Sequence, residues 1–176
     1  KTDTDHSDEG ILTRTAEILA GGGIIAYPTE TFYGLGADAT NHEAIQKIFV
    51  AKGRNFKNPV SLIIASKDDI LPLVQDVPET AKILMDKFWP GALTIVFKAS
   101  DSVSPLLTAG SGKIGLRVSS HPIALKIVQK IKSPLTATSA NQSGMPECAL
   151  ASEVARQIGD KIDAILDWGK TKGEKA

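Results

Sequence analysis

Four polar segments carry the residues of this sequence that could do chemistry. They are PTET (28–31), KGRNFKNP (52–59), GKIGLR (112–117) and TSANQSG (138–144). Each lies at the end of a stretch whose pattern predicts a helix or a strand. Open α/β sheets bind their ligands at such ends, so the four segments together predict one binding site.

Lys52 and Arg54 are two cations at the predicted end of a helix. Asn58 and Pro59 follow, and the proline favours an extended chain that would fix the cations at a sheet edge. Arginine offers a planar fork and lysine a point charge, so the pair suits a polyphosphate better than a single carboxylate. A solvated helix end remains the alternative interpretation.

Arg117 interrupts an apolar run that predicts a strand over residues 114–118. Hydroxyls and amides in the segment 138–144 could hold a ligand by hydrogen bonds at the end of another strand. Both patterns also have ordinary explanations, because arginines occur on exposed strand faces and polar residues are common in loops. An anion site is therefore one of two open interpretations.

Several well-known site patterns are missing from the sequence. Gly34 and Gly36 come too late after the preceding strand to form a dinucleotide-binding turn, and Ala39 stands where the third glycine would be. No GxxxxGK[ST], HExxH, EF-hand or GxSxG motif occurs. The remaining chemistry is cationic stabilisation and positioning, which is typical of phosphoryl or nucleotidyl transfer.

The composition limits the class of protein. With 176 residues, of which 20 are Lys or Arg and 20 are Asp or Glu, the chain is long enough for one domain and has no net charge. Cys148 is the single cysteine, which excludes an internal disulfide and fits a reducing compartment. No apolar run approaches the ~20 residues of a membrane span. We expect a cytoplasmic protein without a membrane segment.

Helical and strand-like patterns alternate along the chain, which predicts a layered α/β fold. Helices are expected over 11–20, from a cap at Asn41 to about Gly53, from a Ser66–Asp69 capping box to Pro72, over 78–89, from Pro122, and from a cap at Ser152 to Ile158. Strands are expected over 24–27, 60–65, 93–98, 114–118, 135–139 and 162–166. We expect one domain over residues 10–176, preceded by a flexible lead-in over 1–9.

The order of several motifs carries more information than any one of them. PTETFYGLG, KGR followed by NP, FWPGALT, IGLRV with HP, and TSANQSG occur in this order. The sequence thereby resembles the YrdC-like family of threonylcarbamoyl-adenylate synthases over about residues 10–168. The resemblance implies a twisted, open, mixed α/β sheet with flanking helices around a deep concave cavity.

The resemblance also implies an activity. Family members combine L-threonine, bicarbonate and ATP into threonylcarbamoyl-adenylate and pyrophosphate, with Mg²⁺ on the phosphates. They pass the product to a transferase complex that modifies tRNA. Carried onto this sequence, the threonine-binding positions are Thr31, Arg117 and the backbone around Ala137.

The remaining positions that the resemblance implies belong to ATP. Lys52 and Arg54 are expected to bind the polyphosphate and to be catalytic. Further ATP contacts are expected from Asn58, Lys113, Ser139 and Asn141.

This sequence departs from the family pattern in three places. Ile63 stands where some members have a histidine that helps to bind threonine, and Asn55 replaces the usual proline after KGR, which is expected to loosen the turn. Members also continue into a Ser-Thr-containing segment that closes over the cavity. We expect that segment to be absent here, which would weaken ligand binding. If it was merely left out of this sequence, activity is expected to be normal.

Two other functions stay open at this point. The same surface could bind double-stranded RNA or tRNA weakly and without catalysis, although the neutral charge and the few aromatic residues speak against it. The substrate could instead be carbamoyl phosphate, as in a related domain of hydrogenase-maturation proteins. Those domains belong to much larger chains.

Overall fold

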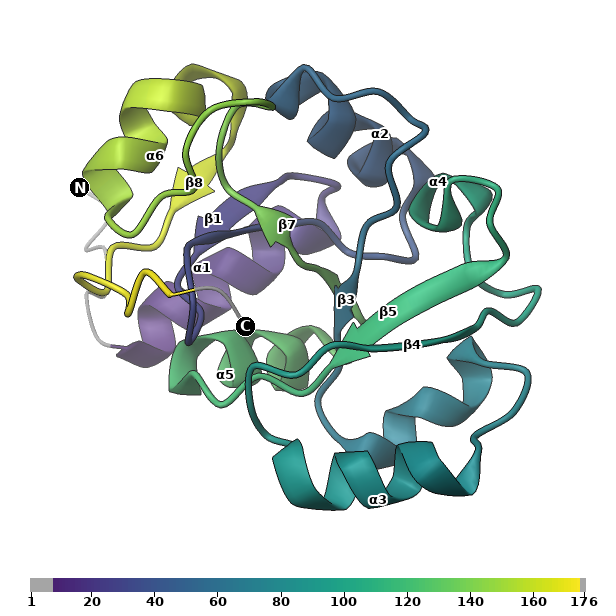
Figure 1. Ribbon diagram of the computed structural model, residues 1–176. Helices are drawn as coiled ribbons and strands as arrows, with labels where there is room; N and C mark the ends of the chain where they lie inside the picture. The colour runs from purple at the N-terminus through teal and green to yellow at the C-terminus, as the bar shows by residue number, and fades with distance from the viewer. Residues whose placement is uncertain (1–7, 175–176) are drawn as a thin grey trace.

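The computed structural model describes residues 8–174, which form two four-stranded sheets with helices around them (Figure 1). The first sheet has the strand order β7-β2-β1-β8 and the second the order β4-β5-β3-β6. The first contains β1 (Ile25–Tyr27), β2 (Gly34–Gly36), β7 (Thr138–Ser139) and β8 (Ala164–Ile165). The second contains β3 (Leu62–Ile63), β4 (Ile95–Lys98), β5 (Lys113–Arg117) and β6 (Leu135–Thr136).

Both sheets are mixed. In the first, β1 pairs antiparallel with β2 and parallel with β8. In the second, β3 pairs parallel with β5 and antiparallel with β6. The predicted mixed α/β class is confirmed, with the strands divided between two sheets.

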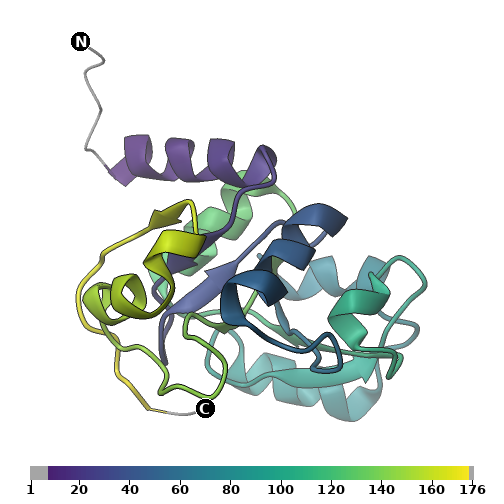
Figure 2. The same cartoon turned by 90° about the horizontal axis from the view of Figure 1, so that it is seen from above.

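The helices surround these sheets (Figures 1 and 2). They are α1 (Asp8–Ala20), α2 (His42–Lys52), α3 (Glu79–Phe88), α4 (Pro105–Thr108), α5 (Pro122–Ile131), α6 (Ala151–Ile158) and the 3-10 helices η1 (Lys67–Leu73) and η2 (Gly159–Lys161). Because α1 begins at Asp8, the last two residues of the predicted flexible lead-in are helical, and the rest of it lies outside the described residues. None of the helices in the described part of the chain is long and apolar enough to cross a membrane.

Two of the predicted helix caps are confirmed. The Asn41 side chain accepts a hydrogen bond from the Ala44 N–H at 3.0 Å and so begins α2. Ser66 and Asp69 form the predicted capping box, in which the Asp69 carboxylate accepts from the Ser66 N–H at 2.8 Å. These two caps fix the residues at which α2 and η1 begin.

The predicted cap of α6 is wrong. The helix begins at Ala151, so Ser152 already lies inside it. The Glu153 carboxylate accepts from the backbone N–H groups of Ala149 and Leu150, at 2.8 and 3.1 Å. A glutamate in the first turn thus satisfies two backbone donors at the entry of the helix.

The strand β2 was not predicted, because its sequence Gly-Leu-Gly has little intrinsic preference for a strand. Its glycines make room for the ring of Tyr27. A Cβ atom at Gly34 would lie 3.0 Å from that ring, and one at Gly36 would lie 2.8 Å from it. The buried Tyr27 hydroxyl then donates to the Thr136 carbonyl at 2.8 Å, and burial raises the pKa of this phenol. Tertiary packing therefore creates a strand that propensity disfavours.

The segment predicted as one strand over 135–139 belongs to both sheets. Its first part, β6, pairs with β3, and its second part, β7, pairs with β2. Between them, the Ala137 N–H donates to the Ser61 carbonyl at 2.8 Å. The chain therefore crosses from one sheet to the other at Ala137, and the sheets meet there.

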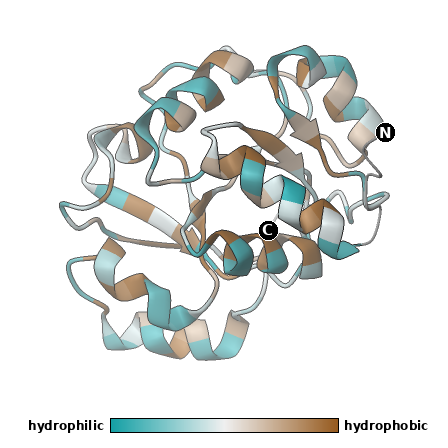
Figure 3. Cartoon of the chain, turned by 180° about the vertical axis from the view of Figure 1, so that it is seen from behind, coloured by the Kyte–Doolittle hydropathy of each residue, from teal (hydrophilic) through white to brown (hydrophobic). Residues whose placement is uncertain are grey.

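Apolar residues make up most of the core, and several strands in the middle of the molecule are coloured as hydrophobic in Figure 3. On β3, Leu62 and Ile64 belong to one core cluster, whereas Ile63 belongs to another cluster that includes residues of α1 and α5. Alternate residues of a strand face opposite sides of its sheet. Ser61 therefore faces the side opposite to Leu62.

Candidate functional site

A small polar cavity of about 190 Å³ lies where the two sheets meet. Four of the predicted site residues line it, namely Thr31, Arg117, Ala137 and Ser139. Its hydroxyl groups come from Thr29, Thr31, Ser61, Thr94, Thr138 and Ser139. The structure thus brings the predicted threonine-binding residues together in one place.

Arg117 is buried at the end of β5, with 10% of its side chain exposed. One of its terminal nitrogens, Nη1, lies 3.2 Å from the Glu30 carboxylate and donates weakly to the Ala92 carbonyl at 3.4 Å. Its Nε atom is buried and has no hydrogen-bond partner. The interpretation of Arg117 as an exposed strand arginine is therefore wrong, and the guanidinium keeps donors for a ligand.

The PTET segment folds back on itself beside Arg117. The Thr29 hydroxyl donates to the Phe32 carbonyl at 2.6 Å and accepts from the Thr31 N–H at 3.2 Å. The hydroxyls of Thr29 and Thr31 lie 3.1 Å apart. This local turn is the reason that the Thr31 hydroxyl reaches the wall of the cavity.

Lys52 is buried and holds the loop that follows β7. Its ammonium group donates to the carbonyls of Ser139 and Asn141, the latter at 2.9 Å, and to the Asn141 side-chain oxygen at 3.0 Å. These bonds use the three donors of an ammonium group. Burial, followed by repulsion from Arg54, lowers the pKa of Lys52 to about 8. Its catalytic role stays a prediction, and in this structure it contacts loop oxygens.

Arg54 contacts the cavity wall through Thr138, which lines the cavity. Its Nη1 donates to the Thr138 hydroxyl at 2.7 Å, and its Nη2 donates to the Pro59 carbonyl at 3.1 Å. Burial lowers the pKa of the guanidinium. Arg54 therefore joins the KGRNFKNP segment to the TSANQSG segment. An anion site formed by both segments would require such a contact.

Of the six predicted ATP contacts, Ser139 lines the small cavity and the other five do not. Asn58 is exposed in the turn after α2, and the Asn141 amide donates to the Met145 carbonyl at 2.6 Å. Lys113 is exposed at the start of β5 and shares a sheet face with Arg117, about 13 Å away by the rise of a strand. The predicted nucleotide contacts therefore extend outward from the cavity.

Two of the three departures from the family pattern have local explanations. The Asn55 carbonyl accepts from the Asn58 N–H at 3.2 Å, and the Asn55 side chain accepts from the Lys57 N–H at 3.0 Å. Asn55 therefore closes the turn that it was expected to loosen. Ile63 packs in the apolar cluster beside α5 and does not line the cavity, so it supplies no contact in place of the histidine.

Sequence reasoning missed Ser61 and Thr94, which line the cavity with Arg117 and directly precede β3 and β4. Gly115 shares a sheet face with Arg117 and leaves room for Ser61 and Thr94. A Cβ atom there would lie 2.7 Å from the Ser61 hydroxyl and 3.0 Å from the Thr94 methyl group. The alternation of Ser61 with the apolar Leu62 was the available signal, since it predicts a polar face on that strand.

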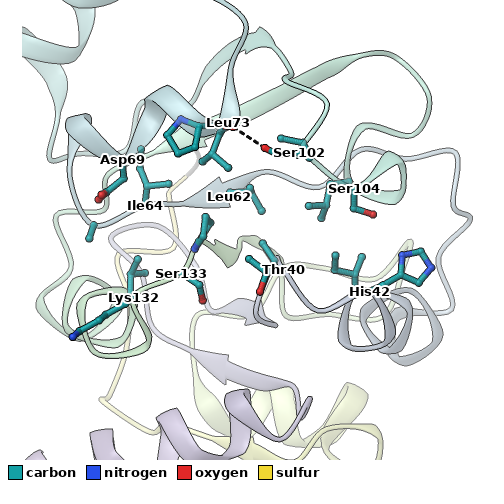
Figure 4. A pocket seen from close by; sticks show the side chains of 18 of the residues that line it. Thr40, His42, Leu62, Ile64, Asp69, Leu73, Ser102, Ser104, Lys132 and Ser133 are labelled. Carbon is teal, nitrogen blue, oxygen red and sulfur yellow. Dashed lines mark hydrogen bonds between the residues drawn. The ribbon is translucent and has the colours of Figure 1, made fainter.

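A larger cavity of about 760 Å³ lies on the opposite side of β3 (Figure 4). Leu62 and Ile64 face it between His42 at one end and Asp69 at the other. Its wall is mostly apolar, and none of the predicted site residues belongs to it. A specific polar site needs converging polar groups, which favours the smaller cavity as the candidate site.

The described residues contain no group of three or more His, Cys, Asp or Glu side chains arranged to hold a metal ion. Glu147 is the carboxylate that lines the small cavity. A single carboxylate beside the cavity fits a magnesium ion that is bound mainly by phosphate oxygens and water.

Comparison with known proteins finds relatives that are similar to this chain over nearly its whole length. A threonylcarbamoyl-AMP synthase of Bacillus subtilis is 40% identical over 171 residues, which are 97% of this chain and 49% of that protein. Another, from Photobacterium profundum, is 36% identical over 93% of this chain and 89% of its own length. The chain therefore spans about half the length of the Bacillus protein and most of the Photobacterium one.

Solved structures of related proteins have the same fold as this chain. The crystal structure of Pyrococcus abyssi Sua5 in complex with L-threonine has a TM-score of 0.92 and 39% identity, and the match covers 96% of this chain and 49% of that one. Escherichia coli YciO, at 24% identity and a TM-score of 0.84, shares the fold over 96% of this chain and 82% of its own. The family profile described as "Telomere recombination" matches residues 17–176. The chain belongs to the Sua5/YciO/YrdC family.

Proposed function

We propose that this chain forms the site that makes threonylcarbamoyl-adenylate from L-threonine, bicarbonate and ATP, as a nucleotidyltransferase that serves tRNA modification. The observation that carries the proposal is Arg117, a buried guanidinium with free donors beside a small cavity lined with hydroxyl groups. Such a cavity suits the carboxylate and hydroxyl of a small amino acid. The names of the relatives and the bound L-threonine in Pyrococcus Sua5 support this choice.

The residues of the cavity would divide the work. Arg117 would pair with the threonine carboxylate, and Thr31, which lines the same cavity, would bond to the amino acid. The amine condenses with bicarbonate to a carbamate and water. A carbamate oxygen then attacks the α-phosphorus of ATP, and the bond to the leaving pyrophosphate breaks.

The second set of residues would hold the nucleotide. Arg54 lies at the cavity wall, where its positive charge can stabilise the phosphates. Lys52 would shape the Ser139–Asn141 loop through the hydrogen bonds that it makes. Asn58 and Lys113 would contact the outer part of ATP. Mg²⁺ would neutralise phosphate charge, and the Glu147 carboxylate in the cavity lining would be available to hold it.

The test is pyrophosphate release by the purified chain. We expect release only when L-threonine, bicarbonate and ATP are all present, together with a product of the mass of threonylcarbamoyl-adenylate. Release without threonine would contradict the proposal. Release that needs carbamoyl phosphate in place of threonine and bicarbonate would indicate the hydrogenase-maturation type of chemistry. Salt-sensitive binding of tRNA with no release would indicate the RNA-binding alternative.

The later steps are part of the same proposal. The product would be consumed by a separate transferase complex acting on tRNA. A coupled assay with such a transferase and unmodified tRNA should then place threonine label in the RNA. Label that appears without the transferase would contradict this division of labour.

A further inference from the structure

Glu30 is a buried carboxylate in the PTET segment, one residue before Thr31. Only 9% of its side chain is exposed, and its Oε1 atom lies 3.2 Å from Nη1 of Arg117. It does not line the small cavity itself. Glu30 therefore contacts Arg117 without lining the space that a ligand would occupy.

The other oxygen of Glu30 is also held. The Ser119 hydroxyl donates to Oε2 of Glu30 and accepts from the His121 N–H at 3.1 Å. Ser119 is completely buried, two residues after Arg117. The carboxylate is thus fixed by two residues from the end of β5, and the PTET segment is tied to that strand.

The bonding of this pair is incomplete. Oε1 of Glu30 and Nε of Arg117 are buried and lack hydrogen-bond partners, although the two side chains are close enough for an ion pair. A guanidinium has five N–H donors, and the weak bond to the Ala92 carbonyl uses part of one edge. A buried cation without an opposite charge would be strongly unfavourable, so Glu30 makes the burial of Arg117 tolerable.

We propose that Glu30 is a positioning residue for Arg117. It holds one edge of the guanidinium and thereby turns the remaining donors toward the cavity. This role rests on the proposed function, in which those donors bind the carboxylate of L-threonine. Glu30 does not touch the substrate, and its effect passes through the orientation of Arg117.

The first experiment compares Glu30→Gln with Glu30→Ala in the pyrophosphate assay. The glutamine keeps the shape and an oxygen that can accept from Arg117, whereas the alanine keeps neither. We expect the KM for L-threonine to rise about tenfold in Glu30→Ala and about threefold in Glu30→Gln. The KM for ATP should change less than twofold in both.

Controls separate this role from a general loss of structure. Ser119→Ala removes the hydroxyl that fixes Oε2 of Glu30, and it should raise the same KM in the same direction. Asp86→Asn breaks the exposed ion pair with Lys67 and should change neither KM. Equal increases in both KM values, or an unchanged threonine KM in Glu30→Ala, would overturn the proposal.

A second readout does not depend on activity. The Nε–H resonance of Arg117, identified by its loss in Arg117→Lys, should be visible in the wild type and broadened by solvent exchange in Glu30→Ala. An unchanged resonance in Glu30→Ala overturns the positioning role even if the protein makes no product. Missing product with the expected broadening would instead reject only the proposed function.

Discussion

Lys52 and Arg117 are both buried cations, yet they differ in the number of hydrogen-bond donors that they keep for a ligand. Lys52 donates to three oxygens of the Ser139–Asn141 loop. Arg117 has a weak bond to Ala92 and an Nε atom without a partner. We therefore expect Arg117 to act on a ligand directly and Lys52 to act through the loop that it holds.

Arg54 and Arg117 should serve different ligands. Arg117→Ala removes a charged donor beside the amino-acid cavity and should weaken threonine binding by about 2–3 kcal/mol, with ATP binding nearly unchanged. Arg54→Ala should weaken ATP binding by a similar amount and leave threonine binding nearly unchanged. Calorimetric titration of each ligand measures both. Lys126→Ala, at an exposed position of α5, is the matched control.

If both arginine variants lose the same affinity for both ligands while remaining folded, the division of the site into a threonine side and an ATP side is wrong.

The titration of Lys52 should appear in the pH dependence of stability. Its pKa is about 8 in the folded chain against an ordinary value of 10.5, so the unfolded chain binds more protons between these values. The free energy of unfolding contributed by this group therefore rises with pH across that window. We expect the wild type to gain stability relative to Lys52→Met between pH 7 and 9.5 in denaturant titrations.

A constant or decreasing difference between the wild type and Lys52→Met over this range would show that the loop oxygens keep the ammonium charged. In that case the pKa is not lowered.

At the scale of the elements, local patterns predicted most helices and the longer strands. The cap at Asn41 and the box at Ser66 were readable because both partners lie within one turn. The strand β2 and the division of 135–139 between two sheets were not readable, since both depend on pairing between distant segments. Local sequence carries little information about such pairings.

The same distinction holds for the site. Arg117 and Thr31 attracted attention by residue type and position, and both line the cavity. Glu30 did not, because its bond to Ser119 joins residues 89 positions apart along the chain. A buried carboxylate is recognised only when its partner is known, and the partner depends on how the PTET turn packs against β5.

The packing of Tyr27 on β2 gives a prediction at this scale. Gly36→Ala would place a methyl group 2.8 Å from the Tyr27 ring and 3.0 Å from the Leu135 side chain. We expect a loss of about 1–3 kcal/mol in the free energy of unfolding, because both neighbours are buried. Chemical denaturation followed by circular dichroism measures it.

Gly159→Ala is the control for this variant. Its Cβ atom would lie 3.5 Å from Ala155, an ordinary contact, and the backbone there is already helical. A neutral or slightly stabilising effect is expected. Equal losses in both variants would contradict the special role of the Tyr27 contact.

At the scale of the whole molecule, the candidate site belongs to both sheets. Thr31 precedes β2 in the first sheet, whereas Ser61 precedes β3 and Arg117 ends β5 in the second. A ligand in the cavity therefore binds only when the two sheets are packed together. The large cavity on the other side of β3 has a mostly apolar wall.

L-Threonine should for this reason raise the melting temperature of the wild type. Binding to the folded state alone adds about 2.7 kcal/mol at a ligand concentration a hundred times the Kd. Scanning calorimetry with and without threonine measures the shift. Arg117→Ala should show almost none at the same concentration, and an equal shift in that variant would place the threonine elsewhere.

The connection between the two sheets at Ala137 is as short as one residue. A single residue separates β6 from β7, and its N–H is bonded to the Ser61 carbonyl. An insertion of one residue at this point would shift the register of β7 on β2 and turn the side chains of Thr138 and Ser139 to the opposite face. The length of this connection is therefore as strictly determined as the identity of any residue in the site.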